Sequence, residues 1–258
     1  MNDPSTKPAT RSPIKNPVKR QAGQALSEYL DEFVGDQALR CILPIGFALF
    51  WLVIEYSRPT PHWLLWSLFA LSIVNFAVRF PRVRRKAKRL RQGFNGERYV
   101  AQIIEKDLIP EGYRVIHDLF IEKGERKFNI DHLLIGRNGV FCLETKTWSK
   151  PVRGQTVATY DGSKILLNGK DCCGDAVSQA RALAKEAQEQ ILKTAGISVK
   201  VTPFVVCVGW FVEKTATGTP DVLVVNEKGL GSFVKNCQGS LDPADAERIY
   251  QRLMESFA

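Results

Sequence analysis

The sequence predicts a mixed α/β domain preceded by two membrane-spanning helices. Two uncharged apolar segments stand close together early in the chain, at residues 41–54 and 63–78. Segments with helix and strand patterns then follow in the order α-βββ-α-β. The 258 residues have an ordinary globular composition, 45% hydrophobic and 24% charged, which excludes collagen-like, coiled-coil and wholly disordered chains. A mean hydropathy of -0.14 is too polar for a polytopic transporter.

The N-terminal third divides into an arm and a pair of apolar segments. Residues 1–24 are rich in Pro, Ser, Thr and Lys and predict a disordered arm, which an amphipathic stretch extends to residue 38. The apolar segments, within 39–80, are each slightly shorter than the ~20 residues of a typical span, but flanking residues at the interface (Arg40, Glu55, Tyr56 and Phe80) can lengthen them. The link between them holds Pro59 and Pro61, which interrupt a helix. A buried helical hairpin of a soluble domain is the alternative, although neither segment has a polar face.

The net charge of +9 is concentrated in one short stretch. Residues 79–91 carry eight Lys and Arg and no acid, whereas residues 92–258 carry 21 residues of each sign. By the positive-inside rule, this cluster places both termini on the cytoplasmic side of a two-pass inner-membrane protein. Residues 81–92, which hold most of the cluster, are expected to form a basic juxtamembrane linker. The cluster could bind nucleic acid, but its position beside the second apolar segment favours membrane lipids with anionic headgroups, contacted through residues 39–91.

The remaining residues, 93–258, predict one α/β domain with C-terminal helices. Residues 95–108 form an amphipathic helix in this interpretation, and Asn138-Gly139 is a strong hairpin signal between two strands. Residues 152–168 are expected to form further short antiparallel strands. The other expected strands are 113–121, 128–135, 140–147, 201–208 and 221–225, and the other expected helices are 175–194, 228–236 and 243–257.

Three charged side chains are expected to converge on this sheet. Glu144 and Lys146 are two residues apart in one strand and therefore project from the same face. The Asn138-Gly139 turn brings the preceding strand antiparallel, so that Asp131 lies near Glu144. An acid inside an apolar strand is costly unless it is paired or bound to a metal. The pattern therefore indicates a functional site.

Two further polar residues lie on core-facing helix stripes. Glu97 precedes Ala101, Ile104 and Leu108 by four, seven and eleven residues, which places it on the apolar face of its helix. Gln179 is placed in the same way in the helix 175–194. Both side chains are expected to join a polar pocket beside the sheet.

These residues resemble the nuclease-related domain (NERD) family, a branch of the PD-(D/E)XK restriction-endonuclease-like superfamily. The resemblance covers about residues 93–212, although no proline precedes Asp131 as it does in part of the superfamily. It implies a restriction-endonuclease-like mixed sheet flanked by helices. Four separated elements carry it, in order: Gly96-Glu97, Asn129-Ile130-Asp131-His132-Leu133-Leu134-Ile135, Gly139-Val140-Phe141-Cys142-Leu143-Glu144-Thr145-Lys146, and Gln179.

The family mechanism, carried over to this chain, implies a metal-dependent catalytic site. Asp131 and Glu144, with Glu97 from the helix, would ligate Mg²⁺ or Mn²⁺, hard ions that prefer carboxylate oxygens and water. Lys146 would orient the attacking water and stabilise negative charge on the phosphate. Gln179 would position water or the carboxylates. His132 is expected to point to the opposite face and to serve packing.

Three hypotheses for function follow. The first is a membrane-anchored, divalent-metal-dependent nuclease that hydrolyses phosphodiester bonds of DNA or RNA. The second is a catalytically inactive NERD-type binding module whose acids are structural, and the third is a membrane-tethered adaptor that acts through residues 226–258. The intact set of Asp131, Glu144 and Lys146 favours the first. The balanced charge of residues 92–258 argues against tight nonspecific binding of DNA by that part alone.

Overall fold

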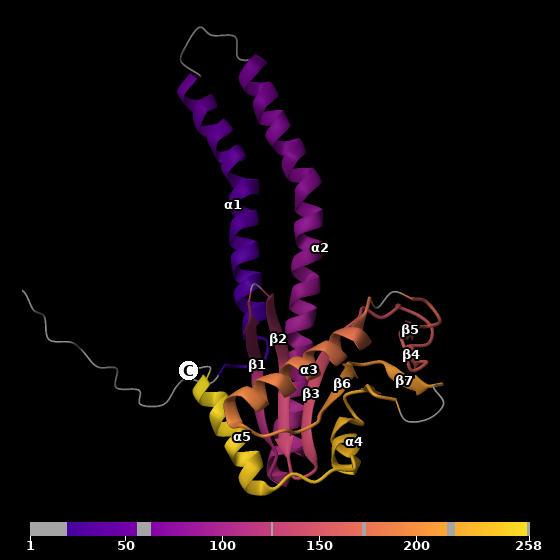
Figure 1. Ribbon diagram of the computed structural model, residues 1–258. Coiled ribbons are helices and arrows are strands. Elements are labelled where there is room, and N and C mark those ends of the chain that lie inside the picture. The colour runs from indigo at the N-terminus through magenta and orange to yellow at the C-terminus, as the bar shows by residue number, and fades with distance from the viewer. Residues whose placement is uncertain (1–19, 56–62, 125, 172–173, 216–219, 257–258) are drawn as a thin grey trace, which may run out of the picture.

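The protein consists of two long helices that extend from an α/β domain (Figure 1). The computed structural model describes residues 20–55, 63–124, 126–171, 174–215 and 220–256. Helix α1 spans Gln24–Glu55 and α2 spans Trp63–Asp107, followed by a short 3₁₀ helix at Ile109–Glu111. Mixed sheets and helices make up the rest of the chain, which confirms the predicted α/β class.

The main sheet has five strands in the order β1-β2-β3-β6-β8. The antiparallel meander of β1 (Arg114–Lys123), β2 (Arg126–Gly136) and β3 (Gly139–Lys146) forms one half. The other half adds β6 (Val201–Cys207) and β8 (Leu223–Val225), both parallel to β3. The Asn138-Gly139 turn joins β2 to β3 as expected, and Gly139 has φ 134°, which favours glycine.

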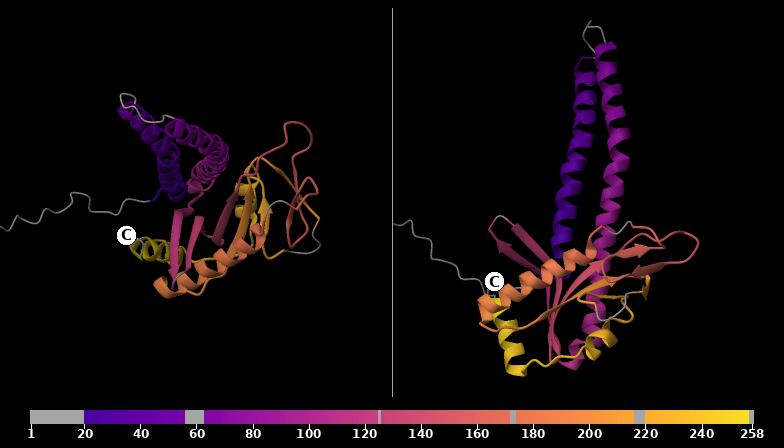
Figure 2. Two further views of the ribbon diagram at one scale, coloured as in Figure 1. Left: turned by 90° about the horizontal axis from the view of Figure 1, so that it is seen from above. Right: turned by 45° about the vertical axis from the view of Figure 1, so that its right-hand side comes forward.

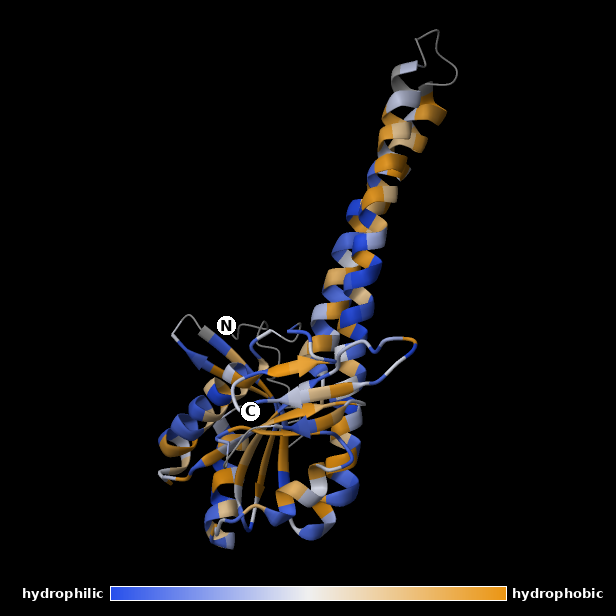
Figure 3. Ribbon diagram, turned by 90° about the vertical axis from the view of Figure 1, so that its right-hand side faces the viewer, coloured by the Kyte–Doolittle hydropathy of each residue, from blue (hydrophilic) through white to orange (hydrophobic). Residues whose placement is uncertain are grey.

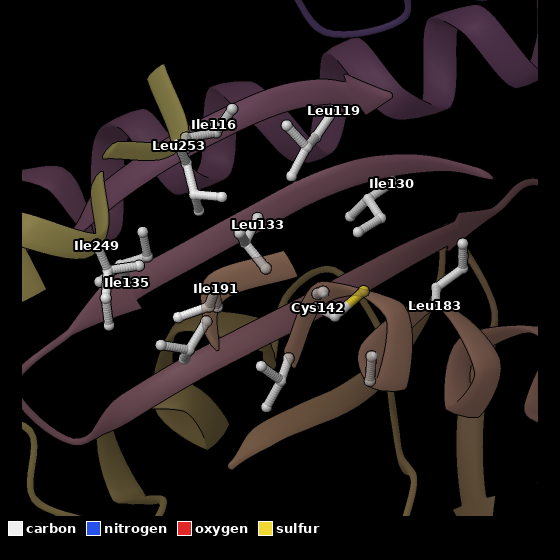
Figure 4. Packing of buried hydrophobic residues seen from close by; sticks show 14 of the residues in the cluster. Ile116, Leu119, Ile130, Leu133, Ile135, Cys142, Leu183, Ile191, Ile249 and Leu253 are labelled. Atoms are coloured by element: carbon white, nitrogen blue, oxygen red, sulfur yellow. The ribbon is translucent and has the colours of Figure 1, made fainter. Parts of the chain in front are cut away.

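Helices cover both faces of this sheet, so that the domain has three layers (Figures 1 and 2). On one face, α3 (Ala176–Ala195) and α5 (Pro243–Ser256) pack on apolar side chains of β1, β2 and β3 (Figure 4). On the other face, the C-terminal part of α2 and the short α4 (Leu230–Asn236) pack on Phe141, Leu143 and Phe204. The central strands are therefore buried from both sides, which explains their continuous apolar sequence.

A smaller sheet stands beside the main one, in the order β5-β4-β7. It consists of β4 (Val157–Tyr160), β5 (Ile165–Leu167) and β7 (Phe211–Lys214). The antiparallel pair β4–β5 lies in the predicted region, whereas β7 and its parallel pairing with β4 were not predicted. Ala176, Val177 and Ala180 at the start of α3 pack on the small sheet. The beginning of α3 is thereby fixed near the end of β3.

The two long helices lie side by side, and their apolar parts are at the ends far from the domain (Figure 3). Near the domain, Lys86 donates a hydrogen bond of 2.8 Å to the Tyr29 hydroxyl and lies over the Phe33 ring. Within the described residues, one helix, Gln24–Ile54, is long and apolar enough to cross a membrane. Only 6% of the most apolar stretch of this helix is buried against the rest of the protein. Large apolar side chains of both helices are exposed, among them Leu39, Ile42, Phe47, Val53, Trp63, Trp66 and Leu71.

Helix continuity differs from the sequence-based expectation at two places. Residues 24–38 were expected in an arm, but they are the first turns of α1. The basic stretch 81–92 was expected as a linker, but it lies inside α2, which runs without interruption into the domain. Lys, Arg and Leu are good helix formers, so the charge cluster does not end the helix. Residues 1–19 of the arm, and the link with Pro59 and Pro61, lie outside the described residues.

Candidate active site

The site forms where β2 and β3 stop pairing. The ladder between these strands runs from Gly136↔Gly139 to His132↔Leu143, and the next residues are Asp131 and Glu144. In place of a ladder bond, Asp131 Oδ2 accepts a hydrogen bond of 2.7 Å from the Thr145 backbone N–H. Asp131 and Glu144 are 8% and 4% exposed. Two buried carboxylates are thereby held together at the end of the apolar part of the sheet.

A change of face in β1 and β2 accompanies this break. On β2, the side chains that pack against α3 are Phe128 and Ile130 before Asp131, and Leu133 and Ile135 after it. Ile130 and Leu133 are three residues apart, whereas residues on one face of a regular strand are two apart. Strand β1 makes the same change around Asp118, whose φ of 54° lies in the left-handed region. Asp118 and Asp131 therefore stand outside the apolar cluster that the neighbouring residues of β1 and β2 form.

Lys146 joins the sheet to α3. Its Nζ donates to Glu144 Oε1 at 2.6 Å and to Gln179 Oε1 at 2.9 Å. Asp175 caps α3 by accepting from the Ser178 N–H, which fixes the first turn of α3 and with it Gln179. The lysine is 23% exposed, so its ammonium group lies between the buried carboxylates and solvent.

Glu97 approaches from the opposite layer because α2 comes unusually close to the end of β3. At Gly96, an added Cβ would clash with the side chain of Thr147. The apolar stripe Val100, Ile104 and Leu108 holds the same helix face on the sheet. Glu97 is therefore turned towards the acids, as its place on that stripe predicted.

The acidic groups disfavour one another's charge. Burial, reinforced by Asp118 and Glu144, raises the pKa of Glu97 to about 7. Burial raises the pKa of Asp131 well above its usual range, and the charges of Glu144 and Glu97 add to this effect. Burial also raises the pKa of Glu144, against the opposing charge of Lys146. One lysine does not neutralise three acids, so the site favours an additional cation or proton.

The donor set fits a divalent cation. Glu144 Oε2 is buried and has no hydrogen-bond partner among the described residues. An orphaned carboxylate oxygen is costly unless a ligand such as a metal ion satisfies it. Among the described residues, no three His, Cys, Asp or Glu side chains lie close enough together to bind one metal ion by themselves. Mg²⁺, however, commonly uses one or two carboxylates and completes its shell with water and substrate phosphate.

Asp118 was missed by the sequence analysis. It is 1% exposed and accepts hydrogen bonds from Arg20, from the Ala25 backbone N–H at 2.8 Å and from Asn129. It thereby attaches the start of α1 to the domain beside Glu97. The available signal was an acid inside the apolar strand 113–121, the same signal that singled out Asp131.

His132 lies apart from the acids. It is completely buried, and its Nδ1 lies 2.8 Å from Nδ1 of His117. Burial lowers the pKa of His132 well below its usual range. The expected packing role agrees with this environment.

Fold and site together define an α/β domain with a carboxylate–lysine centre at the end of its sheet. The sequence comparison then gives the family: residues 92–208 match the family model of the nuclease-related domain, and this part of the chain is a NERD domain. The resemblance drawn from the motifs is thereby confirmed. No curated protein and no solved structure matches the sequence.

Proposed function

We propose that this protein is a membrane-anchored, divalent-metal-dependent nuclease that hydrolyses phosphodiester bonds of DNA or RNA. The observation that carries the proposal is the contact of Lys146 with Glu144 and Gln179, next to Asp131, inside a NERD domain. Two acids and a lysine in this arrangement also match the pattern of the PD-(D/E)XK superfamily, which supports phosphodiester hydrolysis as the reaction.

The proposed metal ligands are Asp131 and Glu144, with Glu97 as a direct ligand or as the acceptor of a metal-bound water. When bound there, Mg²⁺ or Mn²⁺ would lower the pKa of a water and offset negative charge on the phosphate. Lys146 Nζ would leave Glu144 for the attacking water or a phosphate oxygen, and Gln179 Oε1 would keep the ammonium group oriented. Thr145 N–H holds Asp131 in place throughout.

An inactive structural cluster is the competing function, and the Glu144–Lys146 ion pair is the observation in its favour. A purely structural cluster would be expected to satisfy its buried atoms. Glu144 Oε2, which finds no hydrogen-bond partner in the described part of the chain, and the raised pKa of Glu97 instead support a site that takes up a cation.

The proposal places both apolar helix segments in the membrane and the domain in the cytoplasm. The exposed apolar surface of α1 and of the first turns of α2 supports this placement, because such surface is unfavourable in water. The cations that follow residue 78 support the cytoplasmic side for the domain. The first cations of this cluster would contact lipid headgroups.

A cleavage assay tests the function. The full-length protein in detergent is incubated with labelled single- and double-stranded DNA and RNA, with Mg²⁺, with Mn²⁺ or with EDTA. The proposal expects cleavage of at least one substrate that depends on the added metal. Cleavage that persists unchanged in EDTA, or the absence of cleavage of every substrate with both metals, would refute it.

A further inference from the structure

An exposed basic loop leaves the candidate active site directly after Lys146. All seven residues from 149 to 155 are exposed, and Val152 at the tip is fully exposed. The loop carries Lys150 and Arg153, and no acid occurs between Glu144 and Asp161. Its positive charge is therefore not balanced within the segment, unlike that of residues 92–258 as a whole.

The base of this loop is fixed to α2. Gln92 donates a hydrogen bond to the Thr147 carbonyl, the Thr147 hydroxyl donates back to the Gln92 carbonyl, and Ser149 Oγ donates to Gln92 Oε1 at 3.0 Å. On its other side, Lys150 lies over Gly209, where an added Cβ would be 3.0 Å from Lys150 Nζ. The loop is thus held between α2 and the end of β6, with its cations in solvent.

The α2 face that meets this loop is basic as well. Lys88 and Arg89 precede Gln92 by four and three residues, which places all three on one side of the helix. Both cations are exposed. Lys86, by contrast, contacts Tyr29 of α1. Cations of α2 and of the loop therefore border the same side of the molecule, and Lys146 lies at the inner end.

Helix geometry separates these α2 cations from a membrane. If the apolar segment ends at Val78, the ten residues from Arg79 to Lys88 carry the helix about 15 Å further along its axis. The headgroup layer on each side of a bilayer is only about 5–7 Å thick. The continuity of α2 prevents it from folding back, so Lys88 and Arg89 stand in water beyond the headgroups.

We propose that Lys88 and Arg89 of α2 together with Lys150 and Arg153 of the loop form a binding track for the phosphate backbone of a nucleic acid, leading to Lys146. This inference rests on the proposed function and adds to it the surface that binds the substrate. Four cations on one side can neutralise successive phosphates, which supplies the affinity that the balanced charge of residues 92–258 lacks. The membrane-proximal cations of α2 remain available to lipid.

The test measures binding separately from cleavage. Full-length protein in detergent is titrated with fluorescently labelled DNA and RNA in EDTA, at several salt concentrations. The variants are Lys150→Gln/Arg153→Gln and Lys88→Gln/Arg89→Gln, with Lys150→Arg/Arg153→Lys as a charge-conserving variant. The matched control is Arg248→Gln/Arg252→Gln on α5, at the other end of the domain (Figure 1), where both arginines are exposed in short-range ion pairs. Thermal unfolding checks that each variant is folded.

Each double Gln variant should weaken binding about tenfold near 0.1 M salt and reduce the slope of log K against log salt by about 2, because two phosphate contacts are lost. The charge-conserving variant and the α5 control should keep the wild-type slope. Unchanged binding by the loop variant, or binding of the wild type to anionic vesicles but to neither nucleic acid, would overturn the track. Binding with the expected losses but without cleavage in metal would leave the track standing and refute the nuclease. Metal-dependent cleavage together with unchanged binding by the variants would support the nuclease and refute the track.

Discussion

The carboxylate of Asp131 accepts the backbone N–H of Thr145 at 2.7 Å, across two strands whose ladder has already ended. A side chain thus replaces a main-chain acceptor at the point where β2 and β3 separate. The consequence is that Asp131 cannot move away from Glu144 without losing a buried hydrogen bond, which costs about 1–3 kcal/mol. The two acids are held in place before any ligand binds.

Removal of any member of the proposed catalytic set should abolish measurable cleavage. Asp131→Ala and Glu144→Ala each remove a charged metal ligand, and Lys146→Ala removes the cation that faces the phosphate. Losses of several kcal/mol correspond to rate losses of more than about a thousandfold, since each ~1.4 kcal/mol is tenfold. The double variants should be no worse than the singles, because the residues act as one unit. Equal activity of wild type and Lys146→Ala would assign the chemistry to another group.

Without metal, the stability of the protein should fall as the pH rises towards neutrality. The pKa of Glu97 is raised from 4.5 to about 7, so between these values the folded state binds more protons than the unfolded state. Stability from this group is complete below about pH 4.5 and is lost as the pH passes 7, by on the order of 1–3 kcal/mol. Thermal unfolding in EDTA from pH 5 to 8 measures the loss. Glu97→Gln should flatten this dependence, and an unchanged profile in the variant would contradict the assignment.

A side chain at position 96 should damage both stability and activity. Gly96→Ala places a Cβ against Thr147, and overpacking of this kind costs about 1–3 kcal/mol. The displacement of α2 would also carry Glu97 away from Glu144, so cleavage should fall further than stability explains. Gly35→Ala is the matched control, because that helical glycine has open space around it and gains helix propensity. Equal melting temperatures of the two variants would show that α2 does not need the close approach.

The topology should place both termini in the cytoplasm. Single cysteines at Thr60 and Ser256, in a background without the native cysteines, are treated with a membrane-impermeant thiol reagent in intact cells. Thr60→Cys should be labelled and Ser256→Cys should react only after lysis, because the cations after Val78 favour the cytoplasm. Labelling of Ser256→Cys from outside would invert the arrangement. Release of the whole protein by alkaline carbonate would favour a soluble helical hairpin instead.

Periodicity predicted the domain well where one pattern dominated. The expected strands 113–121, 128–135 and 140–147 correspond to β1, β2 and β3 within two residues at each end, and the helix 175–194 corresponds to α3. The Asn138-Gly139 turn and the alternation of sides were sufficient to bring Asp131 towards Glu144. Strand β7 escaped prediction because four residues with little burial carry no clear alternation.

Features that depend on tertiary contacts could not be predicted from the sequence patterns. The stretch 81–92 contains good helix formers, but its charge suggested a linker. The hydrogen bond from Gln92 to the Thr147 carbonyl, which the sequence does not reveal, joins this part of α2 to the domain and explains why the helix continues. The change of face around Asp118 and Asp131 depends on a positive φ at a residue other than glycine, which no periodicity announces. Lys146 was predicted at the site, but its bond to Gln179 depends on the packing of α3.

The most direct test of the account is a metal titration of wild type and Asp131→Asn, in which unfolding temperature and cleavage rate are measured in the same samples. If Asp131 and Glu144 hold a divalent cation, Mg²⁺ or Mn²⁺ should raise the unfolding temperature of the wild type and start cleavage over the same range of concentration. The Asn variant keeps the shape of the side chain but lacks the ligand charge, so it should fold without metal, lose most of the stabilisation and not cleave. A wild-type protein that neither gains stability with either metal nor cleaves any nucleic acid would leave the acids as a structural cluster.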